Sequence, residues 1–107
     1  MSKYFEGIGR RKSAIARVRL AKGKSGFVVN GKKLEEYFPT KTLQNLASES
    51  LIKKFSVSVK VKGGGIKGQA EAVRLGVARA LLKFDPELRP SLKAEGYLKR
   101  DPREKER

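Results

Sequence analysis

The sequence contains no cysteine, no histidine and a single methionine among its 107 residues. Without cysteine the chain forms no disulfide and offers no thiolate to a metal ion. Without histidine it lacks the imidazole ligand and the side chain that most often acts as a general base in enzymes. These absences exclude most enzyme mechanisms, and we expect no catalytic residues, no metal site and no cofactor.

Long apolar runs are missing as well. No stretch approaches the roughly 20 apolar residues that a membrane-spanning helix needs, and no apolar run follows Lys3 as a signal peptide would require. We therefore expect a cytoplasmic protein without a membrane partner. The length suits one domain with a modest core.

Acidic residues are few compared with basic ones: 11 Asp and Glu stand against 26 Lys and Arg, for a net charge of +15. Residues 1–33 hold 10 basic and 1 acidic residues (+9), and residues 54–83 hold 7 and 1 (+6). Residues 34–53 (2 and 3, −1) and 84–107 (7 and 6, +1) are nearly balanced. Two separate positive blocks attract polyanions, either nucleic acid or an anionic membrane.

Apolar and polar residues alternate over much of the N-terminal third. The alternation predicts one extended segment over residues 4–20, whose arginines face outward. Residues 22–26 are rich in turn-forming types and precede the apolar run 27–29, which predicts a hairpin. Asn30-Gly31 predicts a second tight turn, because both residues tolerate positive φ.

The rest of the chain mixes helices with one clear strand. Thr40 is placed to cap a helix over about residues 41–53, and residues 55–62 alternate as a strand does. Helical spacing of apolar residues runs over 66–84, and Asp85-Pro86 begins one more short helix. A second stripe on the long helix lets another backbone approach closely; it consists of Gly68, Ala72 and Gly76.

This order of elements predicts an α+β fold, an α/β sandwich in which helices pack on a single mixed sheet. We expect the globular domain to span residues 1–96. From Lys99 to Arg107 every residue except Pro102 is charged. A segment of that composition cannot form a core, so residues 97–107 are expected to be an extended charged tail.

A basic cluster follows Gly9 and continues onto the outward arginines of the next strand. Arginine forks match phosphate geometry, and Gly7 and Gly9 let a backbone come close. The alternative is a solvated strand edge, but the cluster coincides with the +9 block, which favours RNA contact. The candidate residues are Arg10, Arg11, Lys12, Ser13, Arg17 and Arg19.

A glycine-rich run joins the strand at 55–62 to the following helix. Backbone amides and the positive dipole end at a helix N-terminus form an anion site, to which a lysine adds a full charge. Neither a Walker loop nor a dinucleotide fingerprint is present. The alternative is that the glycines only permit a sharp turn. The candidate residues are Gly63, Gly64, Gly65, Lys67, Gly68 and Gln69.

Two weaker candidates lie further along the chain. Arg74 lies seven residues after Lys67 on one helix flank and Arg79 lies on another, although charged flanks are ordinary on amphipathic helices. Lys99 and Arg100 begin the charged tail, where basic and acidic residues interleave. Such a tail is as readily explained by a solvated chain end as by RNA contact.

Three segments together resemble one protein family: GIGRRKSAIARVRL, VKGGGIKGQAEAVRLGVARALL and YLKRDPREKER. In sequence and order they are similar to the bacterial ribosomal protein S-nine family, and the match covers essentially the whole chain. The resemblance implies a structural constituent of the small ribosomal subunit that binds ribosomal RNA in the subunit head beside other head proteins and supports translation. It assigns RNA-facing positions to residues 10–12, Arg17, Arg19, 63–69, Arg74 and Arg79.

The resemblance also implies a left-handed βαβ crossover like that of the second domain of ribosomal protein S-five, whereas general rules predict a right-handed one. In the family, a long Lys/Arg-rich tail continues after residues like ERDPR and reaches transfer RNA. This sequence stops at Arg107. A transfer RNA contact is therefore not carried over to any residue present.

Two other functions fit the residues less well. A free-standing RNA-binding regulator would use the same surface. A phosphotransferase would place phosphate at the glycine-rich run, but it needs a general base and a metal ligand, and Glu71 is the only carboxylate nearby in sequence.

Overall fold

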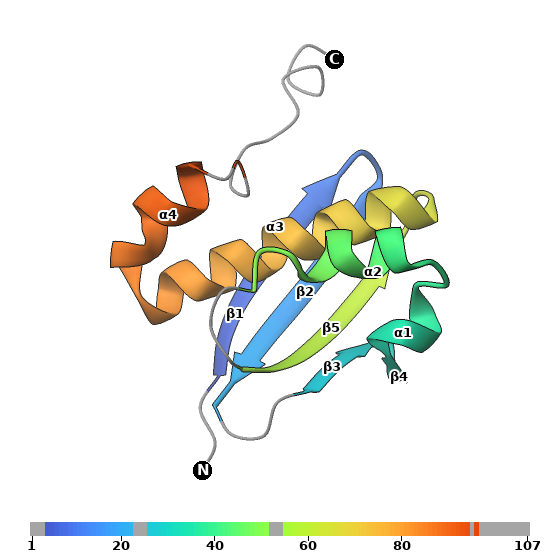
Figure 1. Cartoon of the computed structure of the whole chain (residues 1–107), viewed down its shortest axis with the longest axis horizontal. Helices are drawn as coiled ribbons and strands as arrows, with labels where there is room; N and C mark the ends of the chain where they lie inside the picture. The colour runs from blue at the N-terminus through green and yellow to red at the C-terminus, as the bar shows by residue number, and fades with distance from the viewer. Residues whose placement is uncertain (1–3, 23–25, 52–54, 95, 97–107) are drawn as a thin grey trace.

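A five-stranded mixed sheet has α2 and α3 on one of its faces, and none of the described helices covers its other face (Figure 1). The structure is a computed structural model, and it describes residues 4–22, 26–51, 55–94 and 96. The strands are β1 Tyr4–Arg11, β2 Ala14–Ala21, β3 Gly26–Val29, β4 Lys32–Lys33 and β5 Ser56–Lys62. The helices are α1 Leu34–Tyr37, α2 Lys41–Ser48, α3 Ile66–Phe84, the 3-10 turn η1 Pro86–Leu88, and α4 Arg89–Ala94.

The strand order is β1-β2-β5-β3-β4. β2 pairs antiparallel with both β1 and β5, whereas β3 pairs parallel with β5 and antiparallel with β4. Because β3 and β5 run in the same direction, the chain between them, β4 with α1 and α2, forms a crossover. The predicted α+β class with one mixed sheet and packed helices is therefore correct.

Two strand predictions were wrong. Residues 4–20 are not one extended segment, since Lys12 and Ser13 turn the chain back on itself and β1 pairs with β2. Serine is a common turn residue, but Lys12 adopts a left-handed φ of 57°, which lysine disfavours. The predicted hairpin after β2 does not form either, because β5 lies between β2 and β3. A strand of alternating valines can pair on both edges, and here it does.

Other local predictions were correct. Asn30 and Gly31 turn β3 into β4 with φ of 51° and 81°. The Thr40 hydroxyl caps α2 by accepting a 3.2 Å hydrogen bond from the Leu43 amide, and the Asp85 carboxylate accepts from the Glu87 amide at the start of η1. The helix α2 ends at Ser48, earlier than residue 53.

The edge strand β1 lies directly against α3, where two glycines face the helix. A Cβ at Gly9 would collide with the Ala72 carbonyl oxygen, and one at Gly7 would collide with the backbone of Gly76 and Ala80. The stripe of small residues on α3 therefore does meet another backbone, that of β1. Gly7 and Gly9 were predicted to let a backbone come close, and the backbone that does so is that of α3.

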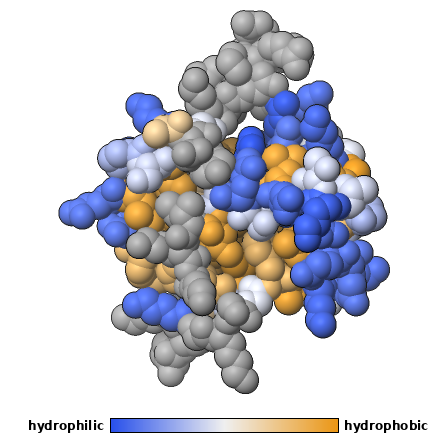
Figure 2. Space-filling view, viewed as in Figure 1, coloured by the Kyte–Doolittle hydropathy of each residue, from blue (hydrophilic) through white to orange (hydrophobic). Residues whose placement is uncertain are grey.

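Packing of α3 on the sheet forms the main core. Each fully buried leucine or valine stabilises the fold by about 1.5–3 kcal/mol relative to an exposed one. The largest such side chains lie on the sheet, α3 and α4: Val18, Leu20, Val29, Val57, Val59, Val73, Val77, Leu81 and Leu92. At one end the aromatic rings of Phe5, Phe55 and Phe84 meet edge to face. Seen from the helix side, apolar residues show toward the middle and hydrophilic ones along both sides (Figure 2).

Candidate nucleic-acid interface

The β1–β2 turn and the glycine-rich run lie side by side, although about 50 residues separate them in the sequence. A Cβ at Gly63 would collide with the Ser13 carbonyl oxygen, and one at Gly64 would lie 3.2 Å from the Ala14 amide nitrogen. The pairing of Ile15 with Lys62 between β2 and β5 creates this proximity. We call this end of the molecule the tip; its residues are Lys12, Ser13, Gly63, Gly64, Gly65, Ile66 and Lys67, all exposed.

The glycines of the tip have different physical requirements. Gly63 and Gly64 adopt φ of 84° and 66°, a conformation that side chains disfavour, and both also lie close to the β1–β2 turn. Gly65 differs, because its φ is −88° and a Cβ there would meet nothing within 4 Å. Turn geometry thus explains two of the glycines but not Gly65, which precedes the first residue of α3.

Helix α3 begins at the tip, where its N-terminus is exposed. Gly65 provides no side-chain cap, so the first amides of this 19-residue helix have no partner from the capping residue. The positive end of the helix dipole and the exposed Lys67 lie at the same place. Gly68, one turn further along, is half-buried near the Arg11 carbonyl oxygen. The arrangement suits an anion such as a phosphate.

A hydrogen-bonded chain holds the glycine-rich run from behind. The Tyr37 hydroxyl donates to Oε1 of Gln69 at 2.6 Å, and Nε2 of Gln69 donates to the Gly63 carbonyl oxygen at 3.1 Å. Gln69 was predicted to contact RNA directly, but its amide group bonds within the protein and positions the loop. Tyr37 had no signal in the sequence that linked it to this run.

The opposite face of the sheet, which we call the open face, carries three of the predicted cations. Arg10, Arg17 and Arg19 are exposed there. β5 adds Lys60 and Lys62, which the sequence analysis did not name as site residues. The alternation of valine with serine or lysine in residues 56–62 places both lysines on one face of the strand, but only the pairing of β5 with β2 brings them beside Arg17. Arg17 and Lys60 are directly opposite each other in that pairing.

Charge is distributed unevenly over the fold. The five strands hold eight basic residues and one carboxylate, that of Glu6. The remaining carboxylates of the described ranges all belong to helices or to residues that cap them: Glu35, Glu36, Glu49, Glu71, Asp85 and Glu87. Oxygen Oε2 of Glu6 accepts from Arg17 at 2.9 and 3.1 Å, and Oε1 lies 3.9 Å from Nε of Arg19. Glu6 therefore bonds Arg17 and lies close to Arg19 on the open face.

Three predicted cations are engaged on the helix side. Nε of Arg11 donates to Glu71 at 2.6 Å, in a pair whose side chains are only about one-fifth exposed. Arg74 donates to Glu49 at 2.6 Å and so joins α3 to the end of α2. Arg79 donates to the Ile8 carbonyl oxygen at 3.0 Å along the outer edge of β1. Of these three, Arg79 is the exposed one.

Lys99 and Arg100 lie outside the described residues, as does the whole segment 97–107. Within the ranges that are described, His, Cys, Asp and Glu nowhere gather in groups of three that could hold a metal ion. None of the helices in those ranges is both long and apolar enough to span a membrane.

Comparison with known proteins gives matches over nearly the whole chain. A family model described as ribosomal protein S9/S16 matches residues 9–107. A small ribosomal subunit protein uS9 from Desulfovibrio desulfuricans is 54% identical over 113 residues, which cover all of this chain and 87% of the relative. Relatives of the same name are 51% identical in Maridesulfovibrio salexigens, with the same coverage, and 45% identical in Porphyromonas gingivalis, over 97% of this chain and 85% of the relative.

Proposed function

Because this chain belongs to the ribosomal protein S9/S16 family, we propose that it is a structural constituent of the small ribosomal subunit that binds ribosomal RNA through the tip and the open face. It is part of bacterial cytoplasmic ribosomes, where it lies in the head of the small subunit beside other head proteins. Its RNA contacts neutralise phosphates and recognise shape more than base sequence.

One observation carries this proposal: two basic motifs distant in sequence meet at the tip, around a helix N-terminus that no side chain caps. Gly65 supports it, since neither its φ nor its surroundings require glycine, whereas close approach of a phosphate does. Lys12 supports it as well. A turn residue with φ of 57° is usually glycine or asparagine. Lysine at this position is strained, which is consistent with a requirement for its positive charge.

The predicted residues take different roles in this proposal. Lys12, Lys67 and the amides of residues 63–68 hold phosphates at the tip, with Ser13 as a further donor. Arg10, Arg17 and Arg19 contact RNA across the open face, with Lys60 and Lys62 added to them. Arg79 reaches RNA along the edge of β1. Arg11, Arg74 and Gln69 chiefly position the surface, because each is bonded within the protein and only partly exposed, whereas Arg17 and Arg79 are exposed. Lys99 and Arg100 extend the contact into the charged tail.

We also propose that the crossover from β3 to β5 is left-handed, as the family resemblance implies, and that residues 1–96 form the domain from which the tail extends. The parallel pairing of β3 with β5 supports the crossover. The chain is not an enzyme in this proposal. A phosphotransferase would need Glu71 as a base or metal ligand, yet Glu71 is held by Arg11.

The test uses the tagged full chain, expressed in a bacterium and followed through a density gradient washed at high salt. Co-sedimentation with the small subunit is expected. A free-standing regulator would remain at the top of the gradient, which would overturn the ribosomal role.

Matched variants locate the surface. Neutralising Arg10, Lys12 and Lys67 to glutamine should weaken binding to small-subunit RNA by at least about tenfold, because three phosphate contacts are removed. Neutralising Lys83, Arg89 and Lys93 makes the same charge change at the far end of α3 and on α4, and should have a much smaller effect. Equal effects would mean that only net charge matters and that the tip is not the site.

A further inference from the structure

We propose that a groove on the open face, between β2, β5 and the β3–β4 turn, binds one unpaired RNA nucleotide. The inference rests on the proposed function, and it deepens it by naming the class of RNA that this part of the surface takes. The groove borders the tip, since Lys62 directly precedes Gly63, but none of the tip residues lines it.

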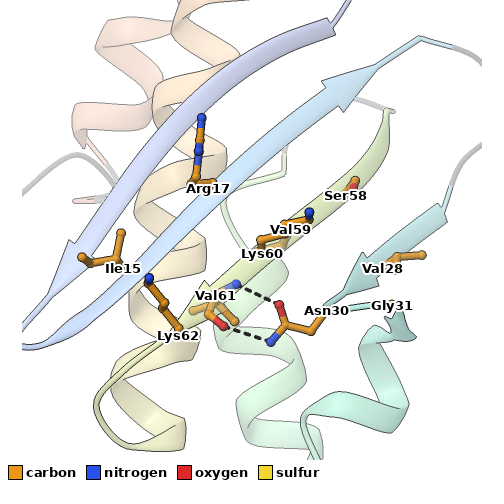
Figure 3. A pocket seen from close by; sticks show the side chains of 10 residues that line it. All are labelled: Ile15, Arg17, Val28, Asn30, Gly31, Ser58, Val59, Lys60, Val61 and Lys62. Carbon is orange, nitrogen blue, oxygen red and sulfur yellow. Dashed lines mark hydrogen bonds between the residues drawn. The ribbon is translucent and has the colours of Figure 1, made fainter.

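The groove has the size and lining of a small-ligand site. It encloses about 710 Å³, within the range of about 300–1,000 Å³ that is usual for such sites. Its apolar surface comes from Ile15, which is half-buried, and Val28, which is 38% exposed. Arg17, Lys60 and Lys62 line the same groove (Figure 3). The groove thus offers both apolar side chains and positive charges to a single ligand.

Of the three cations in the groove, Arg17 is paired with Glu6, whereas no carboxylate of the described residues pairs with Lys60 or Lys62. Glu6 is the only carboxylate on the strands, and its oxygens face Arg17 and Arg19 from the β1 side. Arg17 and Lys60 are directly opposite each other across β2 and β5. Like charges in that relation repel, and a bound phosphate would remove the repulsion. The complementary ligand is therefore an anion.

An unpaired nucleotide fits this lining better than a duplex. The phosphates and ribose hydroxyls of an A-form duplex would meet the cations, but they would leave the Ile15 and Val28 side chains without an apolar partner. A base released from its stack offers apolar faces for these two residues, while its phosphate meets Lys60 or Lys62. The Ser58 hydroxyl, exposed on β5 between these features, can bond the base edge or the ribose.

The same geometry argues against an extended acidic peptide. Such a peptide would bind by adding a strand to the free edge of β5 beyond the end of β3. Asn30 occupies that edge: its Nδ2 donates to the Val61 carbonyl oxygen at 2.9 Å, and its Oδ1 accepts from the Val61 amide at 3.0 Å (Figure 3). Strand addition at this position is therefore blocked.

The test compares two RNAs with the full chain at physiological salt: a short duplex, and the same duplex with one unpaired uridine. Fluorescence anisotropy should show about fivefold tighter binding of the RNA with the unpaired uridine. Val28→Ser, which changes no charge, should abolish this preference and leave duplex binding unchanged. Ile8→Ser is the matched control, because Ile8 is equally exposed, at 39%, but lies on β1 outside the groove; it should keep the preference.

A titration of the unaltered protein gives a readout that does not depend on a variant's folding. The methyl NMR signals of Ile15 and Val28 should shift with the uridine-bulged RNA and not with the duplex. A wild-type protein without preference, or a preference that survives in Val28→Ser, would overturn the groove assignment while duplex binding upholds the proposed function. Shifts caused by an oligoglutamate peptide but not by RNA would make the groove a protein contact. Failure of both RNAs to bind would overturn the proposed function itself.

Discussion

The hydroxyl of Tyr37 and Oε1 of Gln69 lie 2.6 Å apart and join the end of α1 to the first turn of α3. Since Gln69 in turn donates to Gly63, a residue outside every sequence motif restrains the glycine-rich run.

Tyr37→Phe removes this hydrogen bond and changes no charge. The free energy of unfolding should fall by about 1 kcal/mol, because the partly buried amide oxygen of Gln69 loses its partner. RNA binding at the tip should weaken severalfold, since the loop is less well held. Denaturant unfolding and anisotropy measure the two effects. Tyr4→Phe is the control: Tyr4 is 49% exposed, and a phenyl ring there keeps the 4.7 Å contact under the Arg19 guanidinium. Equal losses in both variants would contradict the restraint.

Gly9→Ala tests the seam between β1 and α3. The added methyl group would collide with the Ala72 carbonyl oxygen. Neither backbone can yield without separating strand from helix, so the free energy of unfolding should fall by about 3 kcal/mol or more. Gly26→Ala is the control, because a Cβ there meets nothing within 4 Å; we expect a change of about 0.5 kcal/mol or less. Urea unfolding compares the two, and a well-tolerated Gly9→Ala would contradict the close packing.

Asn30→Ala removes the two side-chain hydrogen bonds to Val61 from a residue with φ 51°. The expected loss of stability is about 2 kcal/mol, from unsatisfied strand groups together with the disfavoured backbone conformation. Asn30→Gly relieves the conformational part alone, so the difference between the variants separates the two causes. Hydrogen exchange at the Val61 amide should accelerate in both. Unchanged exchange would mean that water replaces the asparagine without cost.

Glu6→Gln tests the carboxylate that pairs with Arg17 and Arg19. Stability should change by less than about 1 kcal/mol, because both arginines are more than half exposed and solvent screens the pairs. RNA affinity should rise about threefold, since two guanidinium groups become available to phosphate, and its dependence on salt should steepen. Glu87→Gln in η1 makes the same charge change far from the open face and should leave RNA affinity nearly unchanged. A fall in affinity for Glu6→Gln would show that Glu6 helps binding by positioning the arginines.

Much of the local structure follows from neighbouring residues and was predictable for that reason. Thr40 and Asp85 cap their helices through groups two or three residues away. Asn30-Gly31 turns because those residues tolerate positive φ, and the valines of β5 are buried because alternate side chains of a strand share a face. The prediction of an anion site at the glycine-rich run rests on the same local basis, its position before α3.

Which segments meet depended on contacts that no local pattern contains. The turn at Lys12 and Ser13 forms because β1 and β2 pair with each other, although lysine disfavours the positive φ of residue 12. β5 lies between β2 and β3. In that position both of its edges are hydrogen-bonded to a neighbouring strand, and its valines are buried on one face. Gly7 and Gly9 face a helix that lies more than 60 residues away in the chain.

The sequence by itself determined the charge, the absence of cysteine and histidine, and the basic and glycine-rich motifs, because these are properties of single residues and their neighbours. The tertiary structure alone decided that Lys60 and Lys62 lie beside Arg17, that Glu6 holds two arginines, and that Arg11 and Arg74 are bound to carboxylates. Strand order sets these relations, and strand order depends on how the whole chain buries its apolar faces.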